Sequence, residues 1–233
     1  MAKIPPIPDY IAAGTKNRLI RDKGAMAKVL FNEDLKELKL YRGTLEAFIQ
    51  NEESKDVAVL EKHAVPGDDE FWSYHYPYQW QDVIGSQLRK SFLVSLLSLA
   101  EFHMGLLCRD VAEVVEARIK CDDLRGNSVF ARARKYLEAF GNFQSPAQAV
   151  WEIIGDLYAL RNSIVHNAAL VDNDRNSARI QSLEHKAPGI SFPSAGVVDL
   201  KSEFSIFAIE KVEGFLNDLH QEYVHLCNGF ENG

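Results

Sequence analysis

An arginine and a histidine lie five positions apart in a stretch of the chain that is otherwise apolar. The run Arg161-Asn162-Ser163-Ile164-Val165-His166 follows apolar residues that recur every three or four positions from Val150 onward. Arginine stays protonated at physiological pH and presents a planar fork that fits two phosphate oxygens. Histidine exchanges its proton near neutral pH. A permanent cation and a proton-transfer group near one helix end indicate phosphate chemistry.

The apolar period predicts an amphipathic helix that faces a core over residues 150–169. At about 100° per residue, Leu157 and Ile164 fall within roughly 60° of Arg161, so the guanidinium stands near the centre of the apolar face. An unpaired buried charge is costly, and we therefore expect an anionic group to meet it. Positions five apart differ by about 140°, so Arg161 and His166 point in different directions, whereas Asn162 and His166 share a face.

A third candidate is Glu101, which interrupts the most apolar stretch of the chain. A carboxylate in a buried helix needs a cation, and Arg161 is the expected partner. Asp156 is expected to face solvent and is a weaker choice. The alternative hypothesis is structural: Arg161 and Glu101 form a buried ion pair, and His166 is a helix-end residue favoured by the helix dipole.

The composition is that of a soluble globular protein, with 233 residues, 46% hydrophobic and 25% charged. The net charge of −7 argues against a protein that covers duplex nucleic acid with a long basic face, although a small RNA site remains compatible with it. The three cysteines are widely spaced and match no disulfide framework or metal-ligand pattern, so we expect buried thiols. No histidine cluster has the spacing of a metal site, and neither metal nor cofactor is expected.

The N-terminal residues lack the apolar segment of a secretory signal. The apolar run over residues 92–108 contains two polar, ionisable residues and is short for a membrane span, so a buried core helix explains it better. We expect a cytoplasmic protein that does not enter a membrane.

The pattern along the chain predicts an all-α fold in which about five helices surround one core. A loosely held arm is expected over residues 1–27 and a single helical domain over 28–228. Within the domain, a small β-meander is expected at about 179–200, before the last helix. The helices are expected near residues 27–55, 82–115, 129–140, 146–169 and 202–226.

Two other segments have two interpretations each. The aromatic cluster over residues 71–80 could stack on unpaired bases or pack over the rim of a bundle. The basic segment over residues 118–135 could contact phosphates or could be a solvated helix face.

The string that runs from Leu160 to Asn167 resembles the signature of the HEPN superfamily, in which an Arg is followed by a polar residue and, four to six residues later, by His. The resemblance extends over about residues 28–228, but only this motif is specific. It implies a metal-independent endoribonuclease whose site forms where two protomers dock their Arg/His helices. It further implies that Arg161 binds the scissile phosphate, His166 transfers a proton, Asn162 orients phosphate or imidazole, and Glu101 holds Arg161.

The resemblance thus implies an RNA substrate, a homodimer and a role as a toxin or in phage defence, together with an antitoxin or defence-system partner. The alternative is a non-catalytic HEPN-like module for dimerisation or effector binding that works with a partner protein. A DNA-binding regulator is disfavoured by the acidic balance of the chain and by the lack of a recognisable helix-turn-helix.

Overall fold

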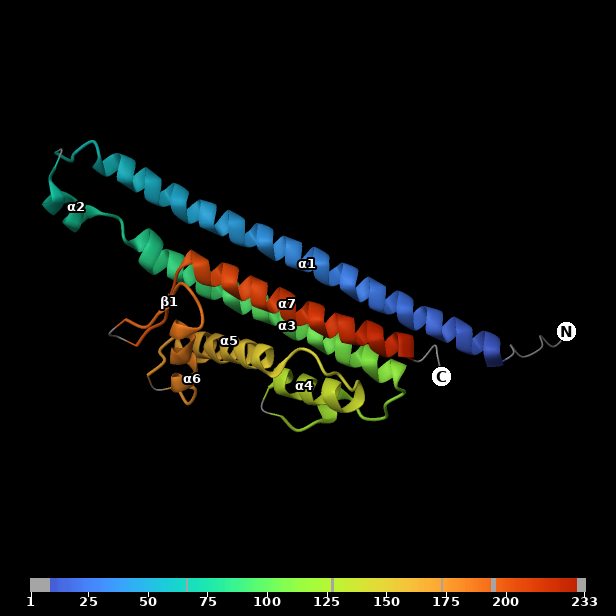
Figure 1. Ribbon diagram of the computed structural model, residues 1–233. Coiled ribbons are helices and arrows are strands. Elements are labelled where there is room, and N and C mark those ends of the chain that lie inside the picture. Colours follow the sequence, from blue (N-terminus) through green and yellow to red (C-terminus); the bar gives the residue numbers. More distant parts are fainter. Residues whose placement is uncertain (1–8, 66, 127, 173, 194–195, 230–233) are drawn as a thin grey trace. The chain divides into compact units, whose positions relative to one another are not determined.

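The protein is all-α with one small sheet, as the sequence predicted. The computed structural model describes residues 9–65, 67–126, 128–172, 174–193 and 196–229, and the side chains from residue 22 onward. The longer helices are α1 (Asp9–Leu60), α3 (Ser86–Val114), α5 (Gln148–Asn167) and α7 (Ser202–Gly229), with α4 (Val129–Phe140) between α3 and α5 (Figure 1).

Shorter elements connect these helices. They comprise α2 (Asp69–His75), a π-helix (Gln79–Gly85) that leads into α3, α6 (Ser177–Gln181), and two 3₁₀ turns (Cys121–Asp123 and Ser182–His185). Strands β1 (Ile190–Ser191) and β2 (Asp199–Leu200) pair antiparallel, with Ile190 opposite Leu200. A separate bridge joins Leu170, shortly after α5, to Val197.

Three expectations about these elements were wrong. Residues 9–27, expected in an arm, are the first turns of α1, and residues 1–8 lie outside the described residues. The start of the expected β-meander, residues 180–184, is helical, because Ile180 and Leu183 are three positions apart and both bury the same helical face. The Arg/His helix begins at Gln148 rather than at Pro146.

The chain divides into two compact units, and the single domain expected over residues 28–228 stays a prediction. Unit 1 comprises residues 1–35, 99–151 and 213–233, and unit 2 comprises residues 36–98 and 152–212. Helices α1, α3, α5 and α7 continue from one unit into the other.

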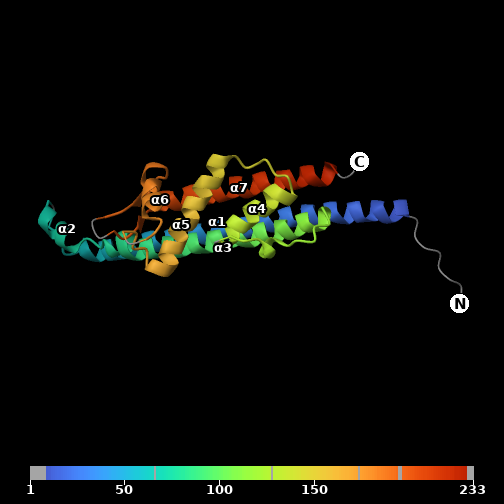
Figure 2. The same cartoon turned by 90° about the horizontal axis from the view of Figure 1, so that it is seen from below.

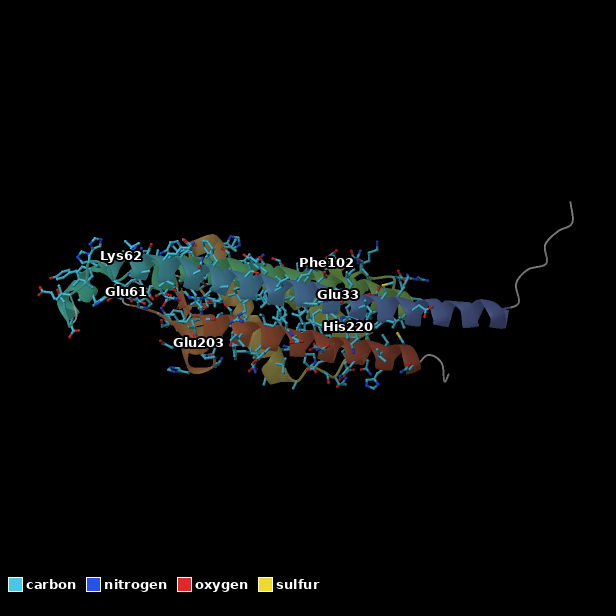
Figure 3. The ribbon with its side chains drawn as sticks, turned by 90° about the horizontal axis from the view of Figure 1, so that it is seen from above. Glu33, Glu61, Lys62, Phe102, Glu203 and His220 are labelled. Carbon is cyan, nitrogen blue, oxygen red and sulfur yellow. The ribbon has the colours of Figure 1, made fainter. Side chains whose placement is uncertain are left out.

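In unit 1 the core joins α1, α3, α4 and α7. Phe31 of α1 packs against the rings of both His103 and His220, and Trp151 meets Phe215 edge to face. Figure 3 shows His220 between α1 and α7. The buried side chains that complete this core are Ala100, Met104, Val111, Ala133, Tyr136, Leu137 and Leu219.

In unit 2 the core joins α1, α3, α5 and the start of α7. The hydroxyl of Tyr158 on α5 donates to the backbone oxygen of Leu97 on α3 (3.1 Å), and Arg42 of α1 donates to Ser202 of α7 (3.0 Å). The short helix α6 lies beside α5 (Figures 1 and 2). The fully buried apolar residues include Ile49, Phe92, Leu96, Ile154, Leu157, Leu200 and Phe204. Helix α5, which carries the candidate site described below, is therefore packed into the core of unit 2.

Among the residues that the structure describes, one helical stretch, Asp69–Val114, is long and apolar enough to cross a membrane by length and composition. Half of its apolar window is buried inside the structure.

Candidate functional site

The end of α5 positions the three motif residues differently. Arg161 and Asn162 are half-buried, whereas His166 is exposed one turn further on. The helix stops after Asn167 because Ala168 and Ala169 both adopt left-handed backbone angles, with φ of 51° and 65°. The Ala169 amide then donates to the Ser163 carbonyl (3.1 Å), which closes the helix end as a C-cap does. The chain turns sharply here and brings the following loop back beside His166.

This turn creates a cavity of about 380 Å³ in unit 2. Its lining combines the last turns of α5 with the loop that follows, and consists of Asn162, His166, Asn167, Asp174, Arg175 and Asn176. All six side chains are polar. A cavity of this size and character suits a charged or strongly polar group better than an apolar ligand.

Asp174 holds the returning loop in place. Its carboxylate accepts a hydrogen bond from the side chain of Asn167 (2.7 Å) and a second one from the backbone amide of Asn176 (2.8 Å). Arg175 lies between these two anchored positions, and its side chain is exposed at the cavity. The loop therefore presents a cation at the cavity that His166 also lines, a feature that the sequence analysis missed.

Arg161 lies next to the cavity rather than in its lining. Its Nη1 donates to the Oδ1 of Asn162 (2.9 Å), and Asn162 in turn lines the cavity. The Nε of Arg161 is buried and has no hydrogen-bond partner among the described residues. Leu157, one turn earlier on the same helix, is fully buried. Arg161 was expected near the centre of the apolar face of α5, whereas it is half-buried and keeps one buried donor without a partner among the described residues.

The structure does not place Glu101 in this site. Glu101 is half-buried on α3 in unit 1 and lines a different cavity, whereas Arg161 belongs to unit 2. The pairing of Glu101 with Arg161 stays a prediction, since the two residues belong to different units.

Asp156 was expected to face solvent, and this expectation was wrong. It is 3% exposed and receives Arg179 Nε of α6 and Lys186 Nζ, the latter at 2.8 Å. Both cations are partly exposed, so they neutralise the buried carboxylate while they remain in contact with water. Asp156 ties α6 and the following turn to α5 and takes no part in the cavity.

The most deeply buried guanidinium of unit 2 is that of Arg89, which the sequence analysis also missed. Arg89 is 2% exposed and binds Glu46 through two hydrogen bonds of 2.9 and 2.8 Å. Its Nη1 also donates to the carbonyl of Leu200 (3.2 Å). Apolar residues at the third, fourth and seventh positions after Arg89 carry the same signal that drew attention to Arg161, namely Phe92, Leu93 and Leu96.

The aromatic cluster is partly tied to α1 by hydrogen bonds. Trp80 donates to Asp56 and Tyr76 to Glu53, both at 2.6 Å, whereas the ring of Tyr74 is 77% exposed. These contacts favour the packing interpretation for Trp80 and Tyr76.

The basic segment over residues 118–135 makes local contacts. Arg134 pairs with Glu138 (2.7 Å), and Lys135 donates to the carbonyl of Arg125 (3.2 Å). Part of its positive charge is therefore already engaged within unit 1.

No group of three or more His, Cys, Asp or Glu side chains is close enough to hold a metal ion within the described part of the chain. Comparisons with family models, curated proteins and solved structures find no match to this chain.

Proposed function

We propose that this protein is a HEPN-like, metal-independent endoribonuclease whose substrate phosphate binds in the cavity at the end of α5. The observation that carries the proposal is the combination of groups at that cavity. The exposed imidazole of His166 lines this cavity together with Asn162 and the cationic Arg175. Arg161 donates a hydrogen bond to the side chain of Asn162 and keeps an unused Nε donor. These groups supply the proton transfer and the anion binding that phosphodiester chemistry requires.

The proposed reaction is an internal transesterification of RNA. His166 removes the proton of a ribose 2′-hydroxyl, whose oxygen forms a bond to the adjacent phosphorus while the bond from phosphorus to the 5′-oxygen breaks. Arg161 and Arg175 stabilise the negative charge that develops on the phosphate oxygens. The leaving 5′-oxygen takes up a proton, so the products carry 2′,3′-cyclic phosphate and 5′-hydroxyl ends.

A second imidazole is needed to donate that proton while the first accepts one. We propose that a second copy of the chain supplies it, in a homodimer formed through the Arg161/His166 helix. The end of α5 offers a surface for such contact, since Val165 is 48% exposed directly before His166. Because Arg161 and His166 point about 140° apart on one helix, a partner helix can bring one chain's imidazole to the other's guanidinium.

The substrate class follows from the charge of the chain. With a net charge of −7, long duplex nucleic acid is repelled beyond the local site. The 2′-oxygen must also approach the phosphorus opposite the leaving 5′-oxygen, and this requires a flexible RNA backbone. We therefore propose single-stranded or loop RNA as the substrate. We further propose that the protein acts in the cytoplasm as a toxin or in phage defence, together with a partner protein that restrains or triggers it.

The decisive experiment is incubation of the purified protein with tRNA, rRNA and mRNA in the presence of EDTA. We expect cleavage that leaves cyclic-phosphate ends, and a loss of roughly 10²–10⁴-fold in His166→Ala, the range typical of a missing acid–base group. His185→Ala is the matched control, because His185 is exposed in the same unit and does not line the cavity. Its activity should equal that of wild type.

Two results would contradict the proposal. One is the absence of RNA cleavage by the wild type on all three substrates. The other is unchanged cleavage by His166→Ala. A dimer in solution without any cleavage would instead support the alternative of a non-catalytic module for dimerisation or effector binding.

A further inference from the structure

A second cavity, in unit 1, brings two of the three cysteines together. It has a volume of about 620 Å³ and lies between α3, the turn after it and the start of α4. Cys108 contributes to it from α3, and Cys121 from the 3₁₀ turn. Phe102, half exposed, and Lys120 lie on the same lining. The cavity gives solvent a route to both thiols.

The two thiols line the same cavity although they are thirteen positions apart in the sequence, and each contributes to the shifted pKa of the other. Cys108 is 1% exposed, and its sulfur lies 3.9 Å from the carbonyl of Ala133 on α4. Cys121 is half-buried and therefore the more accessible of the pair. Neither of them is in a disulfide, and the third cysteine, Cys227, belongs to α7. The sequence predicted buried thiols and no disulfide framework, because the spacing of the cysteines does not reveal the turn that brings Cys121 to the same cavity as Cys108.

We propose that Cys108 and Cys121 are a redox-active pair that forms an intramolecular disulfide when a peroxide enters the cavity. The Cys121 thiolate attacks one peroxide oxygen, the O–O bond breaks, and Cys121 becomes a sulfenic acid. The Cys108 sulfur then attacks the Cys121 sulfur and displaces the hydroxyl group, which leaves as water after protonation. In sum, two thiols and one hydrogen peroxide give one disulfide and two waters, so two electrons pass from sulfur to peroxide.

Burial sets the conditions under which this pair reacts. It raises the pKa of Cys108 and of Cys121 above that of a free cysteine, so little thiolate exists at neutral pH. The pair therefore stays reduced in mild oxidant and reacts faster as the pH rises. Once formed, the bond joins α3 to the 3₁₀ turn across the cavity and closes the loop between them.

The test is peroxide treatment of the full chain, followed by tryptic digestion without reductant and mass spectrometry. Trypsin cuts after Lys90, Arg109, Lys120 and Arg125, so the disulfide joins peptide 91–109 to peptide 121–125. We expect this linked peptide at about 2 Da below the summed masses of the two reduced peptides. Its yield should increase from neutral to mildly alkaline pH.

Cys121→Ser and Cys227→Ser provide the matched variants, since replacement of the buried Cys108 can disturb folding. The linked peptide should disappear in Cys121→Ser and persist in Cys227→Ser. The proposal is overturned if wild type yields sulfinic acid at Cys121 with Cys108 still open to alkylation after denaturation. It is equally overturned if the disulfides formed all involve Cys227.

Discussion

At the scale of single residues, the structure separates two arginines that look alike in the sequence. Arg89 is fully buried and paired with Glu46, so its guanidinium is already satisfied. Arg161 is half-buried and keeps an unused Nε donor next to a polar cavity. The same sequence signal, a cation within an apolar face, thus marks a structural pair in one case and a candidate binding group in the other.

Removal of the carboxylate at Glu46 tests the structural role of this pair. In Glu46→Gln the Arg89 charge stays buried without its counterion, and we expect the free energy of unfolding to fall by about 3–5 kcal/mol. Chemical denaturation at neutral pH measures it. Glu52→Gln is the control, since Glu52 pairs with Lys55, whose side chain is 60% exposed, and should cost less than about 1 kcal/mol. Equal effects of the two variants would refute the assignment.

The Arg161–His166 motif allowed the α5 side of the candidate site to be predicted, but not the loop after α5 that completes the cavity. Asn162 and His166 followed from helical spacing, and both line the cavity. Arg175 could not be predicted, because its position depends on the left-handed turn at Ala168 and Ala169, where neither residue is a glycine. Asp156 was misassigned because its two cations come from α6 and the turn after it, a segment that was expected in the β-meander.

At the scale of elements, the segments with clear end signals were predicted best. Helix α4 has its predicted bounds, since Ser128 caps its start and Gly141 follows its end. Helix α7 begins at Ser202, as expected. The prediction of a loosely held arm was wrong for residues 9–27, because their many polar side chains are compatible with an exposed helix as well as with a loop. Polarity alone does not distinguish these two states.

The cap of α4 can be measured directly. The hydroxyl of Ser128 accepts a hydrogen bond from the amide of Ala131 (3.1 Å), and Ser128→Ala removes this acceptor from the helix start. We expect the free energy of unfolding to fall by about 1 kcal/mol in thermal or chemical denaturation.

Ser98→Ala is the contrasting variant for the same measurement. Ser98 is exposed within α3 and donates to the carbonyl of Val94 (2.8 Å), so alanine should leave stability unchanged or raise it by up to about 0.5 kcal/mol. A loss of the same size in both variants would show that the hydroxyl of Ser128 has no special role as a cap.

At the scale of the whole molecule, the apolar periodicity of the sequence does not reveal the division into two units. Helices α1, α3, α5 and α7 run through both units, so the periodicity shows no break at the boundaries.

The buried ionisable groups differ between the cores of the two units. Unit 2 buries the ionised pair of Arg89 and Glu46, whereas unit 1 buries the two histidines His103 and His220. The stability of unit 1 is therefore expected to depend on pH.

Burial lowers the pKa of His220 from 6.5 to about 4, and the nearby charges of His103 and Lys28 act in the same direction. Burial also lowers the pKa of His103, although its bond to Asp34 (3.0 Å) opposes this shift. Between pH 6.5 and pH 4 the unfolded chain binds a proton at His220 that the folded chain excludes. The contribution of His220 is thus complete above pH 6.5 and is lost as the pH falls toward 4, by about 3 kcal/mol in total.

His220→Gln and His225→Gln separate this effect from general acid denaturation, because both residues are on α7 but His225 is exposed. Stability against urea should fall with decreasing pH in the wild type and in His225→Gln, and less steeply in His220→Gln. Hydrogen exchange should locate the loss in peptides of unit 1, where His220 contacts Phe31. Parallel pH profiles in all three proteins would mean that His220 takes up its proton in the folded state, so that its burial has no part in acid sensitivity.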